Sequence, residues 1–297
     1  MQKQRTPEID QLYKDVLAYR STKDFKSLLS FVSKFRHIAP YNAMLIHIQK
    51  PGSSYVASAA DWKYRFERNV KPGARPLVIL KPFGPVSFVF EYNDTEGKPL
   101  PDDLVRPFIT KEVANPRLLS IIKNGAACDG IEVCEQQYGT SRAGQIEYTG
   151  HEKLLSIKTN SKEVQVRSHY AIVLNSNLSS SEQFTTMLHE LGHFYCGHLN
   201  DGKDKWLPTR PYLDVDQIEF EAETVCWIVC ERLGIESPSV EYLSGYLDEE
   251  QFIPDVSVDA IMKAAGMVEA VLNGTAKPRK DLIVKNNESE QLSMFSV

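Results

Sequence analysis

The sequence contains no apolar run of about 18 residues, the length that a helix needs to span a bilayer, so we expect no membrane span. It begins with a polar segment that has no hydrophobic stretch of the secretory type. It has only five cysteines, an odd number without paired spacing. A disulfide framework is therefore not expected, and the cysteine usage is typical of a reducing, cytoplasmic location.

An excess of positive charge is also missing, because 39 acidic residues outnumber 34 basic ones and leave a net charge of −5. The surface as a whole should not attract nucleic acid. Between residues 62 and 71, however, basic side chains alternate with aromatic ones, a combination that commonly holds single strands. The alternative is an ordinary amphipathic helix with a basic solvent-facing side. The candidate nucleic-acid contacts are Trp62, Lys63, Arg65, Arg68 and Lys71.

The most informative segment reads His-Glu-Leu-Gly-His at residues 189–193. Histidines four apart on a helix project from one face, so His189 and His193 can bind a single metal ion. Glu190 can then reach a water molecule on that metal and act as general base, as in hydrolytic zinc sites. The alternative is a chance pair of helix histidines. A capping box that begins at Ser179 favours the helix that the site needs.

The third ligand decides the class of zinc peptidase. The histidine that a metzincin would carry six residues after His193 is Leu199 here. A glutamate on a later helix is the alternative, and residues 214–234 predict such a helix. We favour Glu219 as the ligand and Glu223, one turn away, as the acceptor that orients a histidine ring. The reverse assignment of these two glutamates stays open.

Four nearby residues receive other interpretations. Glu221 should point away from the metal and be a solvated helix charge. His198 falls one residue short of the metzincin position, so we interpret it as a loop or substrate-side histidine. Cys226 and Cys230 are predicted to pack in the core instead of binding metal, because cysteine is among the most buried residue types.

The motif His-Glu-Leu-Gly-His, followed by Glu219-Phe-Glu-Ala-Glu, resembles the gluzincin core of ImmA/IrrE metallopeptidases and of ArdC-type antirestriction proteins. The N-terminal half adds to the resemblance to ArdC. It carries Tyr-Asn-Ala-Met-Leu-Ile-His-Ile-Gln-Lys-Pro-Gly from Tyr41, Asp61-Trp62, Val-Lys-Pro-Gly from Val70 and Ile-Leu-Lys-Pro from Ile79. The resemblance covers roughly residues 8–275.

This resemblance implies a zinc peptidase that acts on a protein substrate, for example a transcriptional regulator, and an association with mobile genetic elements. It also implies an N-terminal domain that binds single-stranded DNA. We expect an α+β fold, with an N-terminal α/β domain of the ArdC type before a gluzincin-type peptidase domain. In the peptidase domain a small mixed sheet should pack on the zinc helices. The expected bounds are 1–112 and 113–277 for these domains and 278–297 for a disordered tail.

Hydrophobic spacing and turn residues give a coarse map of the elements. We interpret the strand at 169–175 as an edge strand that aligns an extended substrate by β-augmentation. Strands are expected at 77–92, 130–135, 145–148 and 169–175. Helices are expected at 8–50 with a break at Pro40, at 115–124, over the zinc motif, and at 214–234, 238–249 and 256–273, with a loop at 197–213.

The end of the chain resembles a docking peptide. Gln-Leu-Ser-Met-Phe from Gln291 is similar to the pentapeptide by which bacterial proteins bind the replication sliding clamp, with Met294 in place of the usual leucine. Leu292 and Phe295 would be the apolar anchors on a polar segment. The alternative is a featureless tail.

Three functions from different classes follow. The first is a zinc peptidase, the second a DNA-binding antirestriction-type protein with a structural zinc core, and the third a clamp-associated factor. Glu190 favours the first, because a structural site has no use for a base and usually has four protein ligands. The candidates for stabilising the transition state are Tyr170, Tyr195, His198 and Tyr212.

Overall fold

The computed structural model describes most of the chain. Within the described part, no helix is both long enough and apolar enough to cross a bilayer. The expected clamp-docking segment and most of the helix expected at 238–249 lie outside the described residues. The described residues are 22–81, 84–101, 104, 111–139, 142–158, 163–200, 202, 204–210, 212–237, 239, 243, 253–274 and 276–284.

Two helices open the described chain, α2 (Thr22–Lys34) and α3 (Pro40–Gln49). The apolar residues of α2 recur at helical spacing and form its buried face, as the sequence predicts. The break in the helical segment lies between the two helices. Pro40 itself occupies the first turn of α3, where a missing N–H costs no hydrogen bond.

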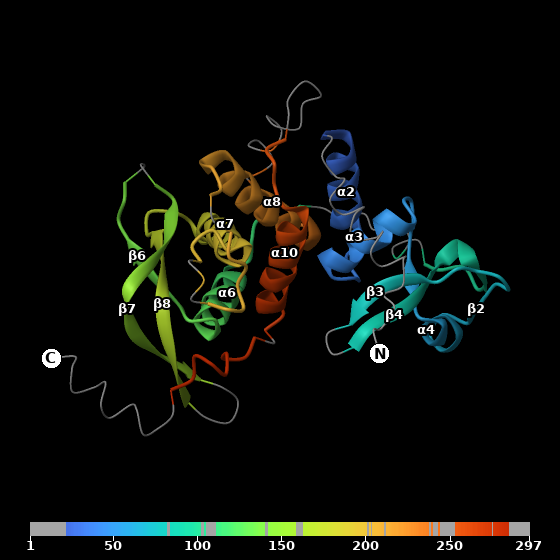
Figure 1. Cartoon of the computed structure of the whole chain (residues 1–297), viewed down its shortest axis with the longest axis horizontal. Helices are drawn as coiled ribbons and strands as arrows, with labels where there is room; N and C mark the ends of the chain where they lie inside the picture. The colour runs from blue at the N-terminus through green and yellow to red at the C-terminus, as the bar shows by residue number, and fades with distance from the viewer. Residues whose placement is uncertain are drawn as a thin grey trace, which may run out of the picture.

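Short strands after α3 form two small sheets (Figure 1). One sheet has the order β1-β4-β3 and the other pairs β2 with β5, and all of these pairings are antiparallel. The strands expected at 77–92 are thereby confirmed. The elements are β1 (Val56–Ala57), α4 (Ala59–Tyr64), β2 (Arg68–Val70), β3 (Leu77–Lys81), β4 (Gly84–Glu91), the 3-10 helix η1 (Tyr92–Asp94) and β5 (Thr95–Gly97).

The next sheet follows helix α6 (Pro116–Cys128) and has the order β6-β8-β7. Its strands are β6 (Ile131–Gln136), β7 (Gly144–Lys158) and β8 (Glu163–Asn175). Strand β8 runs parallel to β6 and antiparallel to β7, so this sheet is mixed as expected.

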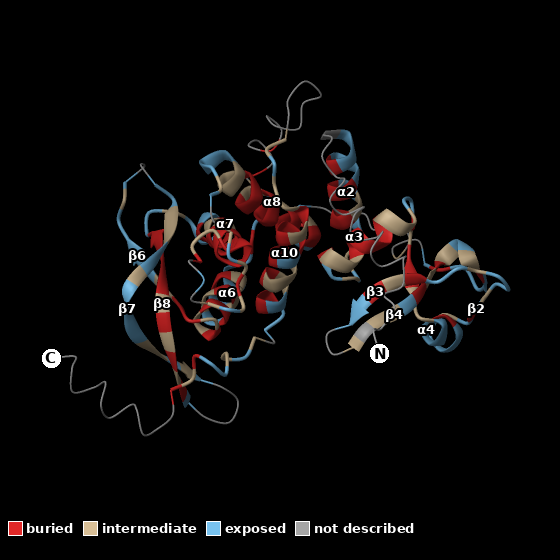
Figure 2. Cartoon of the chain, viewed as in Figure 1, coloured by how far each residue is buried: buried red, intermediate tan, exposed pale blue. Residues whose placement is uncertain are grey.

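Strand β8 corrects one prediction. The segment 169–175 belongs to the central strand of the sheet and not to an edge, because β6 and β7 pair with it on both sides. Its residues from Tyr170 to Asn175 are buried, whereas much of β7 is exposed (Figure 2). Within the described residues β7 pairs only with β8, so β7 keeps one free edge.

Three long helices complete the fold: α7 (Ser180–Cys196), α8 (Val215–Leu233) and α10 (Val258–Leu272). Capping boxes start α7 and α8, and a glycine in the left-handed conformation ends each of them. These are the boundaries that the sequence predicts. Cys226 and Cys230 of α8 are buried in the core, also as predicted.

The elements form successive layers, with the sheet β6-β8-β7 at one end and the small antiparallel sheets at the other (Figure 1). One continuous apolar core includes residues of α2 and α3 together with residues of α7, α8 and α10. Arg232 of α8 also donates hydrogen bonds to the carbonyls of Val32 and Phe35 at the end of α2. The α+β class is confirmed, while the boundary expected at residue 112 stays a prediction.

Candidate metal centre

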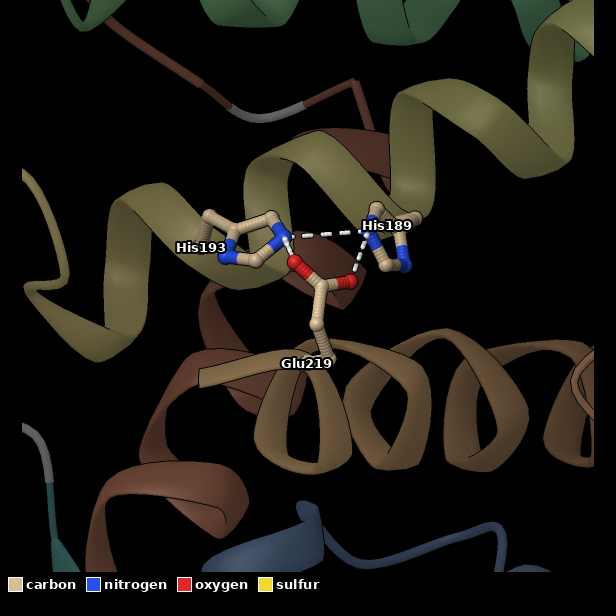
Figure 3. Close-up of side chains that lie close together, drawn as sticks. All are labelled: His189, His193 and Glu219. Atoms are coloured by element: carbon tan, nitrogen blue, oxygen red, sulfur yellow. Dashed lines mark hydrogen bonds and ion pairs between the residues drawn. The ribbon is translucent and has the colours of Figure 1, made fainter. Parts of the chain in front are cut away.

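Helix α7 positions the two histidines of the motif. Its capped ends leave one uninterrupted helix over Ser180–Cys196. His189 and His193 lie one turn apart on the same face, and their Nε2 atoms are 3.0 Å from each other. Figure 3 shows that the carboxylate of Glu219 on the facing helix α8 points at the space between the two rings.

A close contact between α7 and α8 brings this carboxylate into place. Gly192 lies against the backbone of α8, so that a Cβ there would be 3.0 Å from both Cα and O of Ala222. Non-bonded carbon atoms pack at about 3.5–4.0 Å, and glycine allows the helices to approach more closely. Glu219, one turn before Ala222 on α8, therefore reaches the histidines of α7.

The three donor groups fit a zinc ion. Glu219 Oε2 lies 3.4 Å from His189 Nε2, and Glu219 Oε1 lies 3.6 Å from His193 Nε2. Ligands placed tetrahedrally at about 2.0–2.1 Å from zinc would be about 3.3 Å apart, close to these separations. The Glu219 side chain is 40% exposed, so the cluster is open to solvent on one side. The structure brings together the residues nominated as ligands, and their coordinating role stays a prediction.

The electrostatics of the two imidazoles differ. Burial alone would lower the pKa of His189, but the carboxylates of Glu219 and Glu223 outweigh it and raise that pKa to about 10. Burial, together with the positive charge on His189, lowers the pKa of His193 to about 3. The surrounding carboxylates that favour a proton on His189 would equally favour a divalent cation between the rings.

Glu190 lies on the same helix and is 6% exposed. Burial raises the pKa of its carboxyl group, although a hydrogen bond from the backbone N–H of Ile146 on β7 partly opposes this. A carboxylate with a raised pKa is suited to accept and return a proton near neutral pH. The interaction with Ile146 also places Glu190 beside the strand that has a free edge.

The positions of Glu219 and Glu223 support the favoured assignment of their roles. Glu223 Oε1 lies 3.3 Å from Nδ1 of His189, on the side of the ring away from His193. Glu219 instead approaches the Nε2 atoms of both histidines. A ligand must reach the Nε2 side, whereas an orienting acceptor belongs at Nδ1.

The interpretation of Glu221 needs correction, whereas that of His198 holds in part, because His198 lies in the turn after α7 as expected. Glu221 is 0% exposed and forms an ion pair with Arg210, so it is not a solvated helix charge. The side chain of His198 is 2% exposed and lies between His193 and Glu221, which argues against a substrate-side position. The helix spacing correctly predicts that Glu221 lies on a different side of α8 from the metal-facing one. It does not predict that the loop carrying His198 and Arg210 covers the side on which Glu221 lies.

The tyrosines nominated to stabilise the transition state differ in whether their side chains are exposed. The hydroxyl of Tyr170 donates a 2.6 Å hydrogen bond to Asp204, and that of Tyr195 donates one of 2.6 Å to Asp129. Both rings are buried, so neither hydroxyl is presented to a substrate. Tyr212 is 100% exposed and has a φ of +69°, which an L-residue rarely adopts.

Two of the candidate nucleic-acid contacts are wrong. Trp62 is 0% exposed, and its indole N–H donates a hydrogen bond to the carbonyl of Phe90. Arg68 is buried and donates hydrogen bonds to Thr95. Apolar residues from distant segments, including Tyr92 and Leu100, pack around Trp62, which is why its burial could not be read from the local pattern. The candidates that remain exposed are Lys63, Arg65 and Lys71.

Comparisons with known proteins found a family model that matches part of the sequence. No curated protein matches the sequence significantly. The solved structures include a similar one, the Mn(II)-bound antirestriction protein ArdC from the R388 plasmid, with 17% identity and a TM-score of 0.38 over 78% of this chain and 83% of that chain. Residues 130–231, which contain all residues from His189 to Glu223, match the family described as the IrrE N-terminal-like domain. The expected resemblance to ImmA/IrrE metallopeptidases is confirmed over this part of the chain.

Proposed function

We propose that this chain is a zinc-dependent metallopeptidase that hydrolyses peptide bonds in a protein substrate. The observation that supports this most is the convergence of His189, His193 and Glu219 on one point, with Glu190 buried on the same helix as the histidines. The family match over residues 130–231 is independent support. A structural zinc site would usually be closed by a fourth protein ligand.

Zinc held by this donor set would supply a Lewis acid that polarises the scissile carbonyl and activates water at neutral pH. Glu190 supplies the proton transfer. Its carboxylate accepts a proton from the attacking water, and its raised pKa allows it to hold that proton before passing it to the leaving amine. The elements of water are thereby added across the C–N bond, with the hydroxyl group on the carbonyl carbon and the proton on nitrogen.

Strand β7 is the element that we propose for aligning an extended substrate. It replaces the segment 169–175 in this role, because β7 has a free edge and Ile146 on it contacts Glu190. A peptide added to a sheet edge gains affinity from main-chain hydrogen bonds. Tyr212 is the exposed tyrosine among the candidates for stabilising the transition state, and a Tyr212→Phe variant tests that role by its effect on kcat.

The decisive experiment separates metal binding from cleavage. Purified wild type should carry about one zinc per chain, and His193→Ala should lose most of it. Glu190→Gln should keep the zinc but cleave nothing, because an amide cannot accept the proton. Glu182→Gln is a matched control, since it makes the same change on the same helix and a glutamine preserves the capping box.

Cleavage products in the source cell, compared across the proteome between wild type and Glu190→Gln, should identify the substrate. Absence of a transition metal from freshly purified wild type would rule out the metal centre. Equal cleavage by wild type and Glu190→Gln would rule out the assigned role of that residue.

We propose, as a second function, that the N-terminal part binds single-stranded nucleic acid. The supporting observation is the exposed surface of α4, where the ring of Tyr64 is 79% exposed beside Lys63, whose Nζ lies 5.5 Å from its centroid. Tyr64 takes the stacking role that the burial of Trp62 excludes. An aromatic face next to cations is the usual platform for a base and its phosphate.

The full chain should therefore bind single-stranded DNA more tightly than duplex, with an affinity that falls as salt rises. Tyr64→Ala should weaken binding by about 1–3 kcal/mol, the usual contribution of one stacked base. Tyr148→Ala is the control, because Tyr148 is an exposed tyrosine on β7, in the other part of the molecule. Equal binding by wild type and Tyr64→Ala would exclude this surface.

A further inference from the structure

A second cluster of polar side chains lies directly behind the metal centre. It consists of Cys196 at the end of α7, His198 just after it and Glu221 on α8. The side chains of His198 and Glu221 are almost completely buried, at 2% and 0% exposed. Buried polar groups are costly unless each is satisfied, so the contacts within this cluster indicate what it does.

The contacts form one chain that ends at a proposed zinc ligand. His198 Nδ1 lies 3.0 Å from Nδ1 of His193, and His198 Nε2 lies 2.9 Å from Oε2 of Glu221. Arg210 donates to both oxygens of Glu221, with a distance of 2.7 Å to Oε1. The backbone N–H of Ser257 donates to the same Oε1 at 2.7 Å. Every link is a hydrogen bond between buried or half-buried groups.

The direction of these hydrogen bonds follows from the position of His193. Its Nε2 faces Glu219 and His189, so this nitrogen must carry the lone pair that a metal requires. The proton of neutral His193 is then on Nδ1 and is donated to Nδ1 of His198. His198 as acceptor at Nδ1 holds its own proton on Nε2, which it donates to Glu221. Glu221 is fixed as the final acceptor by Arg210.

We propose that His198 is the positioning residue of His193, fixing its tautomer and ring orientation through the chain His193–His198–Glu221–Arg210. The proposal rests on the metal centre proposed above. It gives each zinc histidine a separate support, because Glu223 contacts His189 directly while His198 connects His193 to Glu221. Such partners at the second ring nitrogen raise metal affinity by holding the ligand ready to bind.

A second metal site in this cluster is the competing interpretation, and the geometry disfavours it. The carboxylate of Glu221 already accepts hydrogen bonds from Arg210, His198 and the Ser257 backbone. The guanidinium of Arg210 supplies the positive charge at the position that a cation would need. His198 also turns its Nδ1 towards His193 and is not free to offer it to a metal.

The local sequence explains why His198 can reach back to His193. Gly197 ends α7 in the left-handed conformation, with φ +80°, and the backbone N–H of His198 donates to the carbonyl of His193. A Cβ on Gly197 would lie 2.1 Å from the carbonyl oxygen of Pro208. Glycine is therefore required for this turn, which folds the chain back so that the His198 ring lies against His193.

Two substitutions of His198 test the proposal because each keeps a polar group at only one of the two ring-nitrogen positions. In His198→Asn the amide oxygen occupies the place of Nδ1, so it still accepts the hydrogen bond from His193, but the hydrogen bond to Glu221 is lost. In His198→Gln the amide reaches the place of Nε2 and Glu221 but leaves His193 without an acceptor. The readout is the affinity for Zn²⁺ alone, measured by competition with a chromogenic chelator, alongside thermal unfolding of the metal-free variants.

We expect His198→Gln to weaken zinc binding by about 10- to 100-fold, the usual effect of losing such a partner. His198→Asn should weaken zinc binding less, because its amide oxygen still accepts from His193 although the link to Glu221 is lost. Equal zinc affinity of His198→Gln and wild type, or an equal loss in both variants, would overturn the proposal. Cys196→Ser should leave one zinc per chain, and loss of a second equivalent in that variant would favour a second metal site. A wild type that binds no zinc would instead overturn the metal centre itself.

Discussion

The contact between Gly192 and Ala222 gives a quantitative test of how the metal centre is assembled. A Cβ at position 192 would lie 3.0 Å from two backbone atoms of Ala222, which cannot rotate away. Carbon atoms pack at about 3.5–4.0 Å, so Gly192→Ala should push α7 and α8 apart by roughly 0.5 Å or more. Glu219 would then move away from both histidines.

The free energy of this change has two opposing parts. Replacing a helical glycine by alanine stabilises a helix by about 1 kcal/mol. Overpacking a tight contact costs about 1–3 kcal/mol. Gly192→Ala should therefore range from neutral to about 2 kcal/mol less stable than wild type.

Gly266 on α10 supplies the matched control. A Cβ there would meet only Cδ of Pro40, at 3.9 Å, which is an ordinary contact. Gly266→Ala should therefore show the helix gain alone and be about 1 kcal/mol more stable than wild type. Because both variants gain the same helix propensity, the difference between them isolates the overpacking of about 1–3 kcal/mol.

Urea unfolding of the metal-free proteins, fitted with a common slope, measures this difference. Zinc affinity, measured on the same proteins, should fall for Gly192→Ala and remain unchanged for Gly266→Ala. If Gly192→Ala is as stable as Gly266→Ala and binds zinc as wild type does, the close approach of α7 and α8 does not position Glu219, and the reasoning is refuted.

The remaining predictions concern the ligands, the protons and the C-terminal tail. Glu219→Ala should lose most zinc by metal analysis while Glu223→Ala keeps most of it, and the opposite result would reverse their roles. Zinc binding at pH 6 should release about one proton per ion, because the pKa of His189 is about 10 without metal and a water bound to zinc would still be mostly protonated at that pH. Calorimetry in buffers of different ionisation enthalpy measures this number, and a release of zero or two protons per ion would contradict the assignment. A peptide of residues 286–297 should bind the bacterial sliding clamp with roughly micromolar affinity, and its Leu292→Ala, Phe295→Ala form should not; no binding by the wild-type peptide would make the motif a coincidence.

Local signals predicted the helices of the site well because the physical causes are local. The capping box at Ser179 and the glycine at position 197 act within one turn of the helix, and α7 has the expected ends. The same holds for Asp214 and Gly234 on α8. The spacing of Glu219 and Glu223 then placed two carboxylates on the face that meets the histidines.

The failed predictions depend on partners that are distant in sequence. Trp62 looked like an exposed stacking residue because cations flank it, but Tyr92 packs against its ring and the carbonyl of Phe90 accepts a hydrogen bond from its indole N–H. The segment 169–175 looked like an edge strand, although its apolar run Ala-Ile-Val-Leu was a signal of a strand buried on both faces. Alternation of polar and apolar residues would have been expected at an edge with one solvated face.

Glu221 shows why helix geometry alone could not complete the site. Glu219 and Glu223 share one face of α8, and Glu221, two residues from each, lies on another face. Spacing therefore predicts correctly that Glu221 does not reach the Nε2 atoms of His189 and His193. A face of α8 that is turned away from α7 can still be covered by another segment of the chain. Here the loop carrying His198 and Arg210 covers it, so that Glu221 acts on His193 from behind. Glu219 and Glu223 thus contact the imidazoles of the motif directly, whereas Glu221 reaches His193 only through His198, and only the first two contacts could be read from periodicity.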